Sequence, residues 1–378
     1  MRVALAVHHF PPSIGGSEGY AGRLAEGLVD HGHEVIVYTT THPARGPLRY
    51  RVRGLRRAAI AGPFVAWPEM LRSRLARDVA TADVLHAINF TSFSAVAWLL
   101  IGRHYRRPLV LTTFYHPPFA TGRPLLAALY DRTAGRLIAN GYGTLLVHSA
   151  AERRMLRGHV TSRPRARIRE LTCPPLLAGV APQGSFRRTH RLEGNFVVLY
   201  VGRDEPHDGR WSLLRAAAEL RAEGTLPDLA IVTVGPVQQS PCSSEDRPCR
   251  TAPADGTMRI VGPVSPAELA SAYAESDVVV VPSAYESYGM VVVEALSYGT
   301  PVVSTRTGAA AAFVRPGETG YLFDYGDVTA LKHFLVAVRA VGPRMREAAR
   351  SSVAHLSWAQ TVDETIATYR ELLGSVRR

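Results

Sequence analysis

The chain has 378 residues and a mass of 41.1 kDa, with 46% hydrophobic and 20% charged residues. These values exclude a chain disordered throughout, a collagen and a small disulfide-stabilised protein, and the length predicts two domains rather than one. The net charge of +12 is concentrated in one half, because residues 1–190 carry 26 basic and 10 acidic side chains whereas residues 191–378 carry 18 and 22.

The first half of the chain alternates short apolar runs with stretches of helical periodicity. This alternation is typical of a parallel sheet covered by helices. A buried strand is predicted at residues 2–7, a loop at 8–16 and a helix at about 17–31. Later strands of the same sheet are predicted at residues 34–39, 83–87, 109–113 and 144–148. The first half is therefore predicted to form one doubly wound α/β domain.

The second half begins the same pattern again. Its predicted strands are residues 196–201, 229–234, 259–261, 277–281 and 302–304. Its predicted helices are residues 212–223, 266–276 and about 288–298. Two polar segments interrupt the pattern, and we interpret residues 173–194 as a linker and residues 237–257 as a surface insertion.

The last predicted helix, at residues 358–376, has apolar positions that recur on one face. These positions are Val362, Ile366, Tyr369 and Leu373. Such a stripe must pack on one of the two domains. The predicted organisation is thus a domain at 1–185, a second domain at 186–357 and a C-terminal helix at 358–378 that crosses back to the first domain.

Cysteine usage and hydropathy predict a cytoplasmic protein. Cys173, Cys242 and Cys249 form no metal-ligand set, and an odd count in a chain of this size is typical of a reducing compartment. Cys242 and Cys249 lie close together in a polar loop, where we expect two thiols rather than a disulfide. No stretch approaches the roughly 18 to 20 apolar residues of a membrane-spanning helix.

The most informative stretch is residues 277–300, which contain Glu286 and Glu294. On one helix these two residues would lie about 12 Å apart along the axis. That separation excludes the closely spaced carboxylate pair of a retaining glycosidase. We therefore place Glu286 in the loop between strand and helix, and Glu294 on the helix.

A helix start beside a carboxylate predicts a particular ligand. The backbone N–H groups of residues 287–291 open the helix and favour an anion such as a diphosphate. A carboxylate accepts hydrogen bonds from adjacent pairs of sugar hydroxyls, which suit its two oxygens. The stretch is therefore predicted to bind a sugar nucleotide.

At this point the sequence resembles a known family. Residues 282–303, PSAYESYGMVVVEALSYGTPVV, resemble the signature of the group 1 retaining glycosyltransferases, in which seven residues separate two glutamates. Three further segments resemble the same family, namely residues 10–39, 198–203 and 317–323. The resemblance implies the GT-B fold, in which two Rossmann-like doubly wound domains face each other across a cleft.

The resemblance also implies roles for individual residues. Glu294 would bind the ribose hydroxyls, Glu286 would hold the donor sugar, and Arg203 would clamp the diphosphate and stabilise the charge on the leaving group. His116 matches a histidine beside the donor sugar and acceptor, so the implied catalytic residues are His116, Glu286 and Arg203. The implied donor-binding residues are Gly15, Gly16, Arg203, Pro263, Val264, Glu286, Ser287, Tyr288, Gly289, Met290, Val291 and Glu294.

Two positions depart from the family pattern. Five residues after Arg203 the family usually has a lysine that also grips the diphosphate, whereas this chain has Asp208. A carboxylate there would repel the diphosphate unless it points away, and His207 or Arg210 are candidates to substitute for the lysine. The family commonly has a glutamate where this chain has Ala312. Both departures bear on donor specificity and on activity itself.

Neither a metal site nor a further cofactor is predicted. The chain lacks an Asp-x-Asp motif at a strand end, and its histidines form no set with ligand spacing. It also lacks a GxGxxG loop after the first strand, which argues against a nicotinamide oxidoreductase. The nucleoside-diphosphate sugar is therefore expected as a co-substrate, held by protein groups alone.

The basic first half suggests what accepts the sugar. Arg49, Arg51 and Arg53 alternate as on a strand with one charged face, and more arginines follow at residues 56, 57, 72, 74 and 77, at 103, 106 and 107, and between 153 and 169. A solvated surface shaped by codon bias is one interpretation. The other is attraction to an anionic partner: a phosphorylated acceptor, a lipid-linked acceptor or a peripheral membrane contact. Nucleic acid is not expected, because no aromatic platform accompanies the arginines.

The predicted reaction is transfer of a sugar from a nucleoside-diphosphate sugar, UDP- or GDP-linked, to a hydroxyl with retention at the anomeric carbon. No side chain offers itself as a nucleophile, so the resemblance favours departure and attack on the same face of the sugar. Two alternatives stay open. One is a non-catalytic relative that binds sugar nucleotides, and the other is a sugar-nucleotide 2-epimerase on the same fold.

Overall fold

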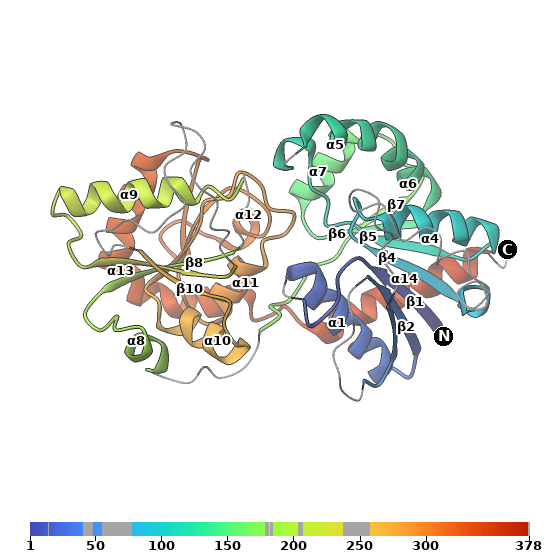
Figure 1. Cartoon of the computed structure of the whole chain (residues 1–378), viewed down its shortest axis with the longest axis horizontal. Coiled ribbons are helices and arrows are strands. Elements are labelled where there is room, and N and C mark those ends of the chain that lie inside the picture. The colour runs from blue at the N-terminus through green and yellow to red at the C-terminus, as the bar shows by residue number, and fades with distance from the viewer. Residues whose placement is uncertain are drawn as a thin grey trace. The chain divides into compact units, whose positions relative to one another are not determined.

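The computed structural model describes residues 1–376 except residues 14, 41–47, 55–77, 122, 178–180, 182–183, 203–206 and 237–257. The chain divides into two compact units (Figure 1). The N-terminal unit comprises Met1–Leu176 together with Leu356–Arg378, and the C-terminal unit comprises Leu177–His355. Each unit is built around its own parallel sheet.

The sheet of the N-terminal unit has seven parallel strands in the order β3-β2-β1-β4-β5-β6-β7. The strands are β1 (Arg2–Val7), β2 (Glu34–Thr39), β3 (Arg51–Gly54), β4 (Val84–Ile88), β5 (Leu109–Thr112), β6 (Thr144–Val147) and β7 (Arg167–Glu170). The helices are α1 (Gly16–Asp30), α4 (Phe93–His104), α5 (Pro124–Tyr130), α6 (Arg136–Gly141), α7 (Ala150–His159) and α14 (Trp358–Val376), with a short 3-10 helix, η1 (Pro118–Ala120), and a π-helix, η2 (Asp131–Gly135).

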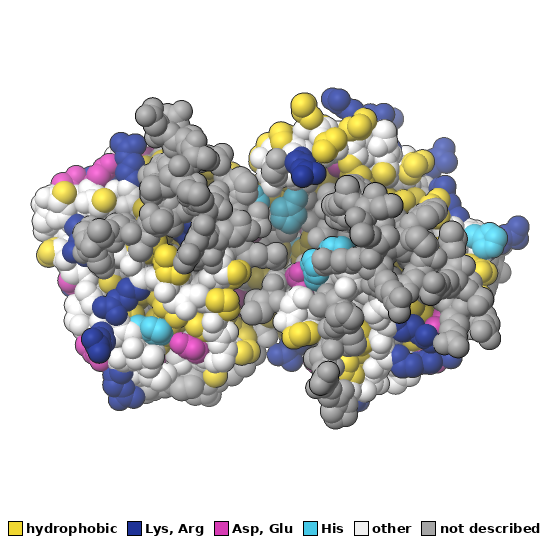
Figure 2. Space-filling model, viewed as in Figure 1, with side chains coloured by type: hydrophobic (Ala, Val, Ile, Leu, Met, Phe, Trp, Pro, Cys, Tyr) yellow, Lys and Arg dark blue, Asp and Glu magenta, His cyan; other side chains and the backbone are white. Residues whose placement is uncertain are grey.

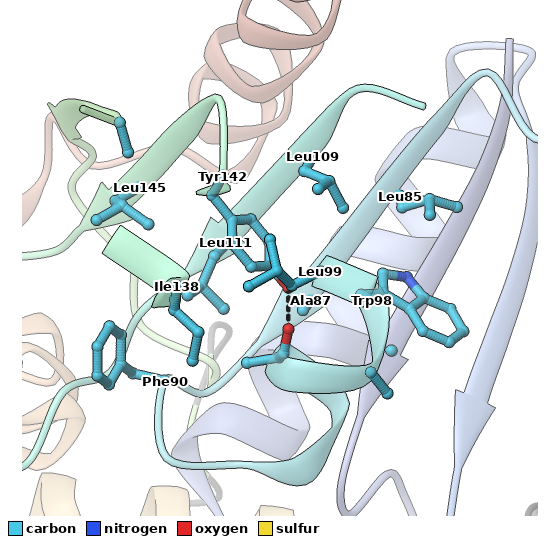
Figure 3. Close-up of a cluster of buried hydrophobic side chains, with 14 of the residues drawn as sticks. Leu85, Ala87, Phe90, Trp98, Leu99, Leu109, Leu111, Ile138, Tyr142 and Leu145 are labelled. Carbon is cyan, nitrogen blue, oxygen red and sulfur yellow. Dashed lines mark hydrogen bonds between the residues drawn. The ribbon is translucent and has the colours of Figure 1, made fainter. Parts of the chain in front are cut away.

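One core of the N-terminal unit lies between its central strands and two helices (Figure 3). Leu85 and Leu111 project from β4 and β5 toward side chains of α4 and α6, and all are buried. The polar ends of the large aromatic residues are satisfied within this core. Trp98 Nε1 donates to the carbonyl of Ala4, and Tyr142 Oη donates to the carbonyl of Ala95 at 2.6 Å.

The C-terminal helix α14 packs on the N-terminal unit, against α1 (Figure 1). Of its predicted apolar stripe, Val362, Ile366 and Tyr369 are buried, and each contributes about 1.5 to 3 kcal/mol of burial free energy. The two helices approach closely because Gly27 has no side chain: a Cβ there would lie 2.5 Å from Cγ2 of Val362. Tyr369 Oη also lies 2.6 Å from Nδ1 of His86 on β4.

The C-terminal unit has six parallel strands in the order β10-β9-β8-β11-β12-β13. The strands are β8 (Phe196–Val201), β9 (Leu229–Val234), β10 (Met258–Gly262), β11 (Val278–Val281), β12 (Val302–Thr305) and β13 (Gly320–Phe323). The helices are α8 (Ser185–Thr189), α9 (Arg210–Ala222), α10 (Pro266–Glu275), α11 (Met290–Ser297), α12 (Ala310–Phe313) and α13 (Val328–Val353). The four consecutive valines of β11 are all buried, as in a central strand covered on both faces.

The limits between the units differ from the predicted ones. The first boundary lies after Leu176 rather than after residue 185, and the second after His355 rather than after residue 357. The predicted linker at 173–194 is not a plain loop, because it contains α8. This short helix belongs to the C-terminal unit, where the backbone N–H of Arg187 donates to Glu275 of α10 at 2.8 Å. The predicted insertion at 237–257, with Cys242 and Cys249, lies outside the described residues.

Several arginines predicted to form a basic face are paired with acidic residues. Arg51 on β3 bonds to Glu34 on the neighbouring strand β2, and Arg53 pairs with Asp78 at 2.7 Å. Arg49 pairs with Asp30 at 2.5 Å. The arginines at 56, 57, 72, 74 and 77 lie outside the described residues. The β2–β3 edge is therefore less basic than its sequence alone suggests.

Candidate active site

The loop between β11 and α11 carries the predicted donor-binding residues at the carboxyl edge of the second sheet. In parallel sheets this edge is where ligands bind, because the loops after successive strands meet there. Glu286 lies in this loop and Glu294 lies on α11, as predicted. The helix begins at Met290 rather than at residue 288, because Gly289 has a left-handed conformation with φ 86°.

Glu286 is half-buried between two loops. Burial raises the pKa of its carboxyl, while a hydrogen bond with the Ser283 side chain acts in the opposite direction. The loop after β12 passes close by, and a Cβ on Gly308 would lie 2.2 Å from the carbonyl oxygen of Tyr288 and 3.1 Å from Cβ of Glu286. Only glycine allows this approach at φ 50°. The fold thus presents Glu286 in a tight, desolvated corner.

Glu294 is held by an aromatic side chain that the sequence patterns did not reveal. Only 6% of Glu294 is exposed, and Tyr273 Oη of α10 donates to its Oε2 at 2.8 Å. The Tyr273 ring in turn stacks on Tyr298, with ring centroids 5.9 Å apart. One carboxylate oxygen is thus fixed by Tyr273. The orientation of Glu294 is therefore set by the protein before any ligand binds.

The start of α11 has backbone N–H groups without an acceptor inside the helix. No side chain of the described residues caps this helix, whose N-cap is Gly289. The residues around this start are Ser287, Tyr288, Gly289, Met290 and Val291. Ser287 and Tyr288 are buried, and the Tyr288 carbonyl accepts from the backbone N–H of Ala309. Uncapped N–H groups favour an anion.

The loop after β10 reaches the same edge of the sheet. Pro263 and Val264 directly follow Gly262, the last residue of β10, and precede Ser265, which caps α10 by accepting from the backbone N–H of Glu268. Because β10 runs parallel to the other strands, this loop opens on the same side as the loop that carries Glu286.

Asp208 lies beside Arg210 in the loop between β8 and α9. The Asp208 Oδ1 accepts from the backbone N–H of Arg210 at 3.0 Å, and the buried Arg210 guanidinium lies 6.0 Å from the ring centroid of Tyr200. Burial raises the pKa of Tyr200. The negative charges of Asp208 and Glu286 raise it further, and the positive charge of Arg210 lowers it. Asp208, Arg210 and Glu286 therefore all lie close enough to Tyr200 to act on it electrostatically. Arg203 lies outside the described residues.

The two loops that carry Asp208 and Glu286 are joined by a backbone hydrogen bond and pack closely against each other. The backbone N–H of Ala284 donates to the carbonyl of His207 at 2.8 Å. A Cβ on Gly209 would lie 2.0 Å from the carbonyl oxygen of Pro282, so a residue larger than glycine would push the loops apart. Asp208 is thus held close to the Glu286 loop by the backbone.

Replacing Asp208 by asparagine should tighten donor binding. Asparagine keeps an oxygen that can accept from the backbone N–H of Arg210, but it removes the negative charge that would repel a diphosphate. We expect the KM for the donor to fall about fivefold, a change of about 1 kcal/mol. Steady-state kinetics against donor concentration measures it. Asp327→Asn is the control, because Asp327 Oδ1 likewise accepts from a backbone N–H at the start of a helix, that of Ala330 in α13. A raised KM in Asp208→Asn would contradict the expectation.

The N-terminal unit contributes the other predicted residues. Gly15 is the N-cap of α1 and Gly16 is its first residue, so both stand where the loop after β1 meets the helix. His116 follows β5, again at the carboxyl edge of its sheet. Its Nδ1 lies 3.0 Å from the carbonyl oxygen of Phe114. A carbonyl only accepts, so Nδ1 carries the proton, and in the neutral ring Nε2 is the basic nitrogen.

Sequence reasoning missed Glu152, which organises the loop that carries His116. The fully buried Glu152 accepts from Thr113 Oγ1 at 2.6 Å, from the backbone N–H of Tyr115 at 2.7 Å and from the backbone N–H of His148 at 2.7 Å. Between the first two donors lies Phe114, a bulky residue at φ 38°. Burial raises the pKa of Glu152 to about 7. The sequence does contain a signal that points to Glu152, because Ser149 and Glu152 form an S-x-x-E pattern, which is typical of a helix start.

Each unit therefore assembles its own set of predicted residues at the carboxyl edge of its sheet. The C-terminal unit brings together the residues from 286 to 294 with Asp208 and Arg210, and the N-terminal unit presents Gly15, Gly16 and His116. Ala312 lies exposed on the short helix α12. Among the described residues, no group of three or more His, Cys, Asp or Glu side chains is arranged to hold a metal ion.

Comparison with known proteins matches both units. Residues 183–337 match the family model for glycosyl transferases group 1, and residues 15–172 match the model for the glycosyl transferase 4-like domain. A D-inositol 3-phosphate glycosyltransferase of Mycobacterium leprae is 32% identical over 416 aligned residues, which cover 98% of this chain and 93% of the relative.

Solved structures resemble the whole chain. The sucrose-phosphate synthase of Thermosynechococcus elongatus superposes with a TM-score of 0.74 at 22% identity, covering 99% of both chains. Anabaena HepE, in a complex with UDP and glucose, superposes with a TM-score of 0.74 at 19% identity, covering 98% of this chain and 99% of that one. At these identities the likeness concerns the fold.

Proposed function

The chain belongs to the group 1 glycosyl transferases and has their GT-B fold, and from this premise we propose that it transfers a sugar from a nucleoside-diphosphate sugar to an acceptor hydroxyl. The observation that carries the donor assignment is the geometry around α11. An orienting tyrosine fixes Glu294, the uncapped helix start follows Gly289, and Glu286 stands in a desolvated corner.

Each of these groups matches one part of the donor. The carboxylate of Glu294 binds the two ribose hydroxyls, and the N–H groups of Ser287 to Val291 bind the diphosphate together with Arg203. Glu286 accepts hydrogen bonds from hydroxyls of the donor sugar. We propose UDP as the first nucleotide to test, because HepE, a protein of the same fold, has been solved with UDP and glucose.

The acceptor we propose bears a phosphate. The relative at 32% identity is named for D-inositol 3-phosphate, and residues 1–190 of this chain carry a net positive charge. Arginine guanidinium groups bind phosphate through paired hydrogen bonds. A phosphorylated polyol and a lipid-linked phosphate share this chemistry.

We propose that the reaction retains the configuration at the anomeric carbon and needs no metal ion. The positive groups that face the leaving diphosphate would be Arg203 and the start of α11, which stabilise its growing charge. His116 would accept a hydrogen bond from the sugar or acceptor through Nε2. The acceptor hydroxyl would then attack from the face that the diphosphate leaves.

Thermal unfolding with a panel of UDP, GDP, ADP and TDP tests the donor assignment. A nucleotide that binds only the folded chain raises the unfolding temperature, and at 100 times its Kd it stabilises by about 2.7 kcal/mol. We expect UDP to give the largest shift. Glu294→Ala should abolish most of this shift, because the ribose contacts are lost, whereas Glu318→Ala, an exposed glutamate of the same unit, should keep it.

Product analysis then tests transfer itself. Labelled UDP-sugar is incubated with the protein and a set of phosphorylated polyols, and glycosylated product with released UDP is the expected result. Binding with neither transfer nor donor hydrolysis would instead indicate a non-catalytic relative. Conversion of the donor sugar to its epimer without any acceptor would indicate an epimerase.

A further inference from the structure

A segment of the N-terminal unit exposes large apolar side chains to solvent. Residues 118–141, spanning η1, α5, η2 and α6, hold five of the ten exposed large hydrophobic residues among the described part of the chain. Their exposed fractions are 53% for Phe119, 85% for Leu125, 59% for Leu126, 59% for Leu129 and 60% for Leu137. Helix α5 buries none of its own residues. We call residues 118–141 the apolar segment.

The stretch that contains the apolar segment, residues 118–165, has no exposed acidic residue of its own, and among its arginines Arg153 pairs with the partly exposed Glu170 at 2.9 Å. Residues 118–165 contain arginines at 123, 132, 136, 153, 154, 157, 163 and 165. The same stretch contains two acidic residues, Asp131 and Glu152, and both are buried. Asp131 accepts from Tyr115 Oη at 2.5 Å, and Glu152 faces the loop of His116. Yellow and dark-blue side chains lie together over α5 in Figure 2.

A small basic pocket adjoins the apolar segment. It has a volume of about 210 Å³. Its polar walls include Arg132, Arg136 and His159 together with the buried Asp131, and Pro118 and Ala128 line its apolar side. Arg132 and Arg136 are exposed, and Arg136 Nε also donates to the carbonyl of Val160 at 3.2 Å. Two guanidinium groups at one pocket suit a phosphate group.

We propose that the apolar segment docks on the surface of an anionic lipid bilayer. A bilayer surface supplies acyl chains for Leu125, Leu126 and Leu129 and phosphates for the surrounding arginines, whereas water solvates only the charges. The excess of positive charge favours this occupant over a second copy of the chain, because two such faces would repel each other. None of the described helices is long and apolar enough to cross a membrane, so docking would be peripheral.

Vesicle co-sedimentation of the full chain tests this proposal without any donor or acceptor. Vesicles of phosphatidylcholine are compared with vesicles of equal parts phosphatidylcholine and phosphatidylglycerol. We expect at least about tenfold stronger binding to the anionic vesicles, weakened by 0.5 M salt because the charges are screened. The triple variant Leu125→Ser, Leu126→Ser, Leu129→Ser should bind about tenfold less. Arg132→Gln with Arg136→Gln should lose most of the preference for anionic vesicles.

The controls come from the C-terminal unit. Ile260→Ser with Arg344→Gln changes one exposed apolar and one exposed basic residue there, and it should bind like the unchanged protein. All substituted side chains in the apolar segment are exposed, and the one described hydrogen bond lost is that of Arg136 with the Val160 carbonyl, so thermal unfolding should shift little. Equal binding to both kinds of vesicle, or binding that neither variant of the segment weakens, would overturn the proposal. The proposal would also be overturned if light scattering detected a dimer and the triple leucine variant were monomeric. Because no sugar nucleotide is present, these outcomes are independent of the proposed reaction.

Discussion

Replacing Glu286 by glutamine should lower kcat about a thousandfold while the donor KM changes little. In the proposed reaction this carboxylate would contact the donor sugar next to the breaking bond, and the desolvated corner made by Gly308 and the Tyr288 carbonyl would strengthen its electrostatic effect. A loss of that size corresponds to about 4 kcal/mol of transition-state stabilisation. Steady-state kinetics with saturating acceptor measures the effect.

The pH profile distinguishes a charged Glu286 from a merely structural one. Burial raises the pKa of Glu286. As the pH falls, its carboxylate should therefore be protonated, and activity should decline, at a higher pH than for an exposed glutamate. The acid limb of kcat should therefore be present in the unchanged enzyme and absent in Glu286→Gln. Glu347→Gln, whose side chain is 84% exposed, is the control and should keep both rate and limb. A Glu286→Gln enzyme with normal kcat would remove Glu286 from the active site.

Replacing Glu152 by alanine should destabilise the N-terminal unit by roughly 3 to 5 kcal/mol. The change leaves Thr113 Oγ1 and the backbone N–H groups of Tyr115 and His148 buried without their acceptor. It also releases the loop that holds His116, so kcat should fall even where the protein stays folded. Denaturant unfolding measures the free energy of unfolding. Steady-state kinetics at denaturant concentrations far below the unfolding midpoint measures kcat of the folded variant.

The same residue should make stability depend on pH with a definite sign. The Glu152 pKa is about 7 in the folded chain against a reference value of 4.5, so between these values the folded state binds more protons than the unfolded state. The contribution of Glu152 to the free energy of unfolding is therefore fully present below pH 4.5 and is lost as the pH rises through 7. This loss amounts to roughly 3 kcal/mol. Glu152→Gln should flatten this dependence, whereas Glu170→Gln, a partly exposed control, should not. A stability that rises over this range would contradict the assignment.

The sheet and the placement of the two glutamates could be predicted because both depend on local patterns. Strand β8 is a continuous apolar run and β9 is apolar except for Thr233, and the bounds of both strands agree with the prediction. Glu286 in a loop and Glu294 on a helix follow from the change of periodicity between them. The start of α11 was placed two residues early, because a sequence does not show that Gly289 takes a left-handed conformation.

Contacts between distant residues could not be predicted. Tyr273 lies 21 positions before Glu294, and Thr113 lies 39 positions before Glu152, so only the tertiary structure brings them together. The pairing of Arg51 with Glu34 likewise depends on the register of β2 and β3. The apolar segment escapes prediction for another reason. Its leucines follow helical spacing but face solvent, and spacing alone does not distinguish a buried face from an exposed one.

The return of α14 to the N-terminal unit determines the order in which the two units can be completed during synthesis. All residues of the C-terminal unit, 177–355, leave the ribosome before Leu356–Arg378. Until then Gly27 on α1 lacks its contact with Val362, and His86 lacks its contact with Tyr369. The unit translated first therefore cannot be completed until the second has been translated, and its unfinished surface is exposed to chaperones during that time.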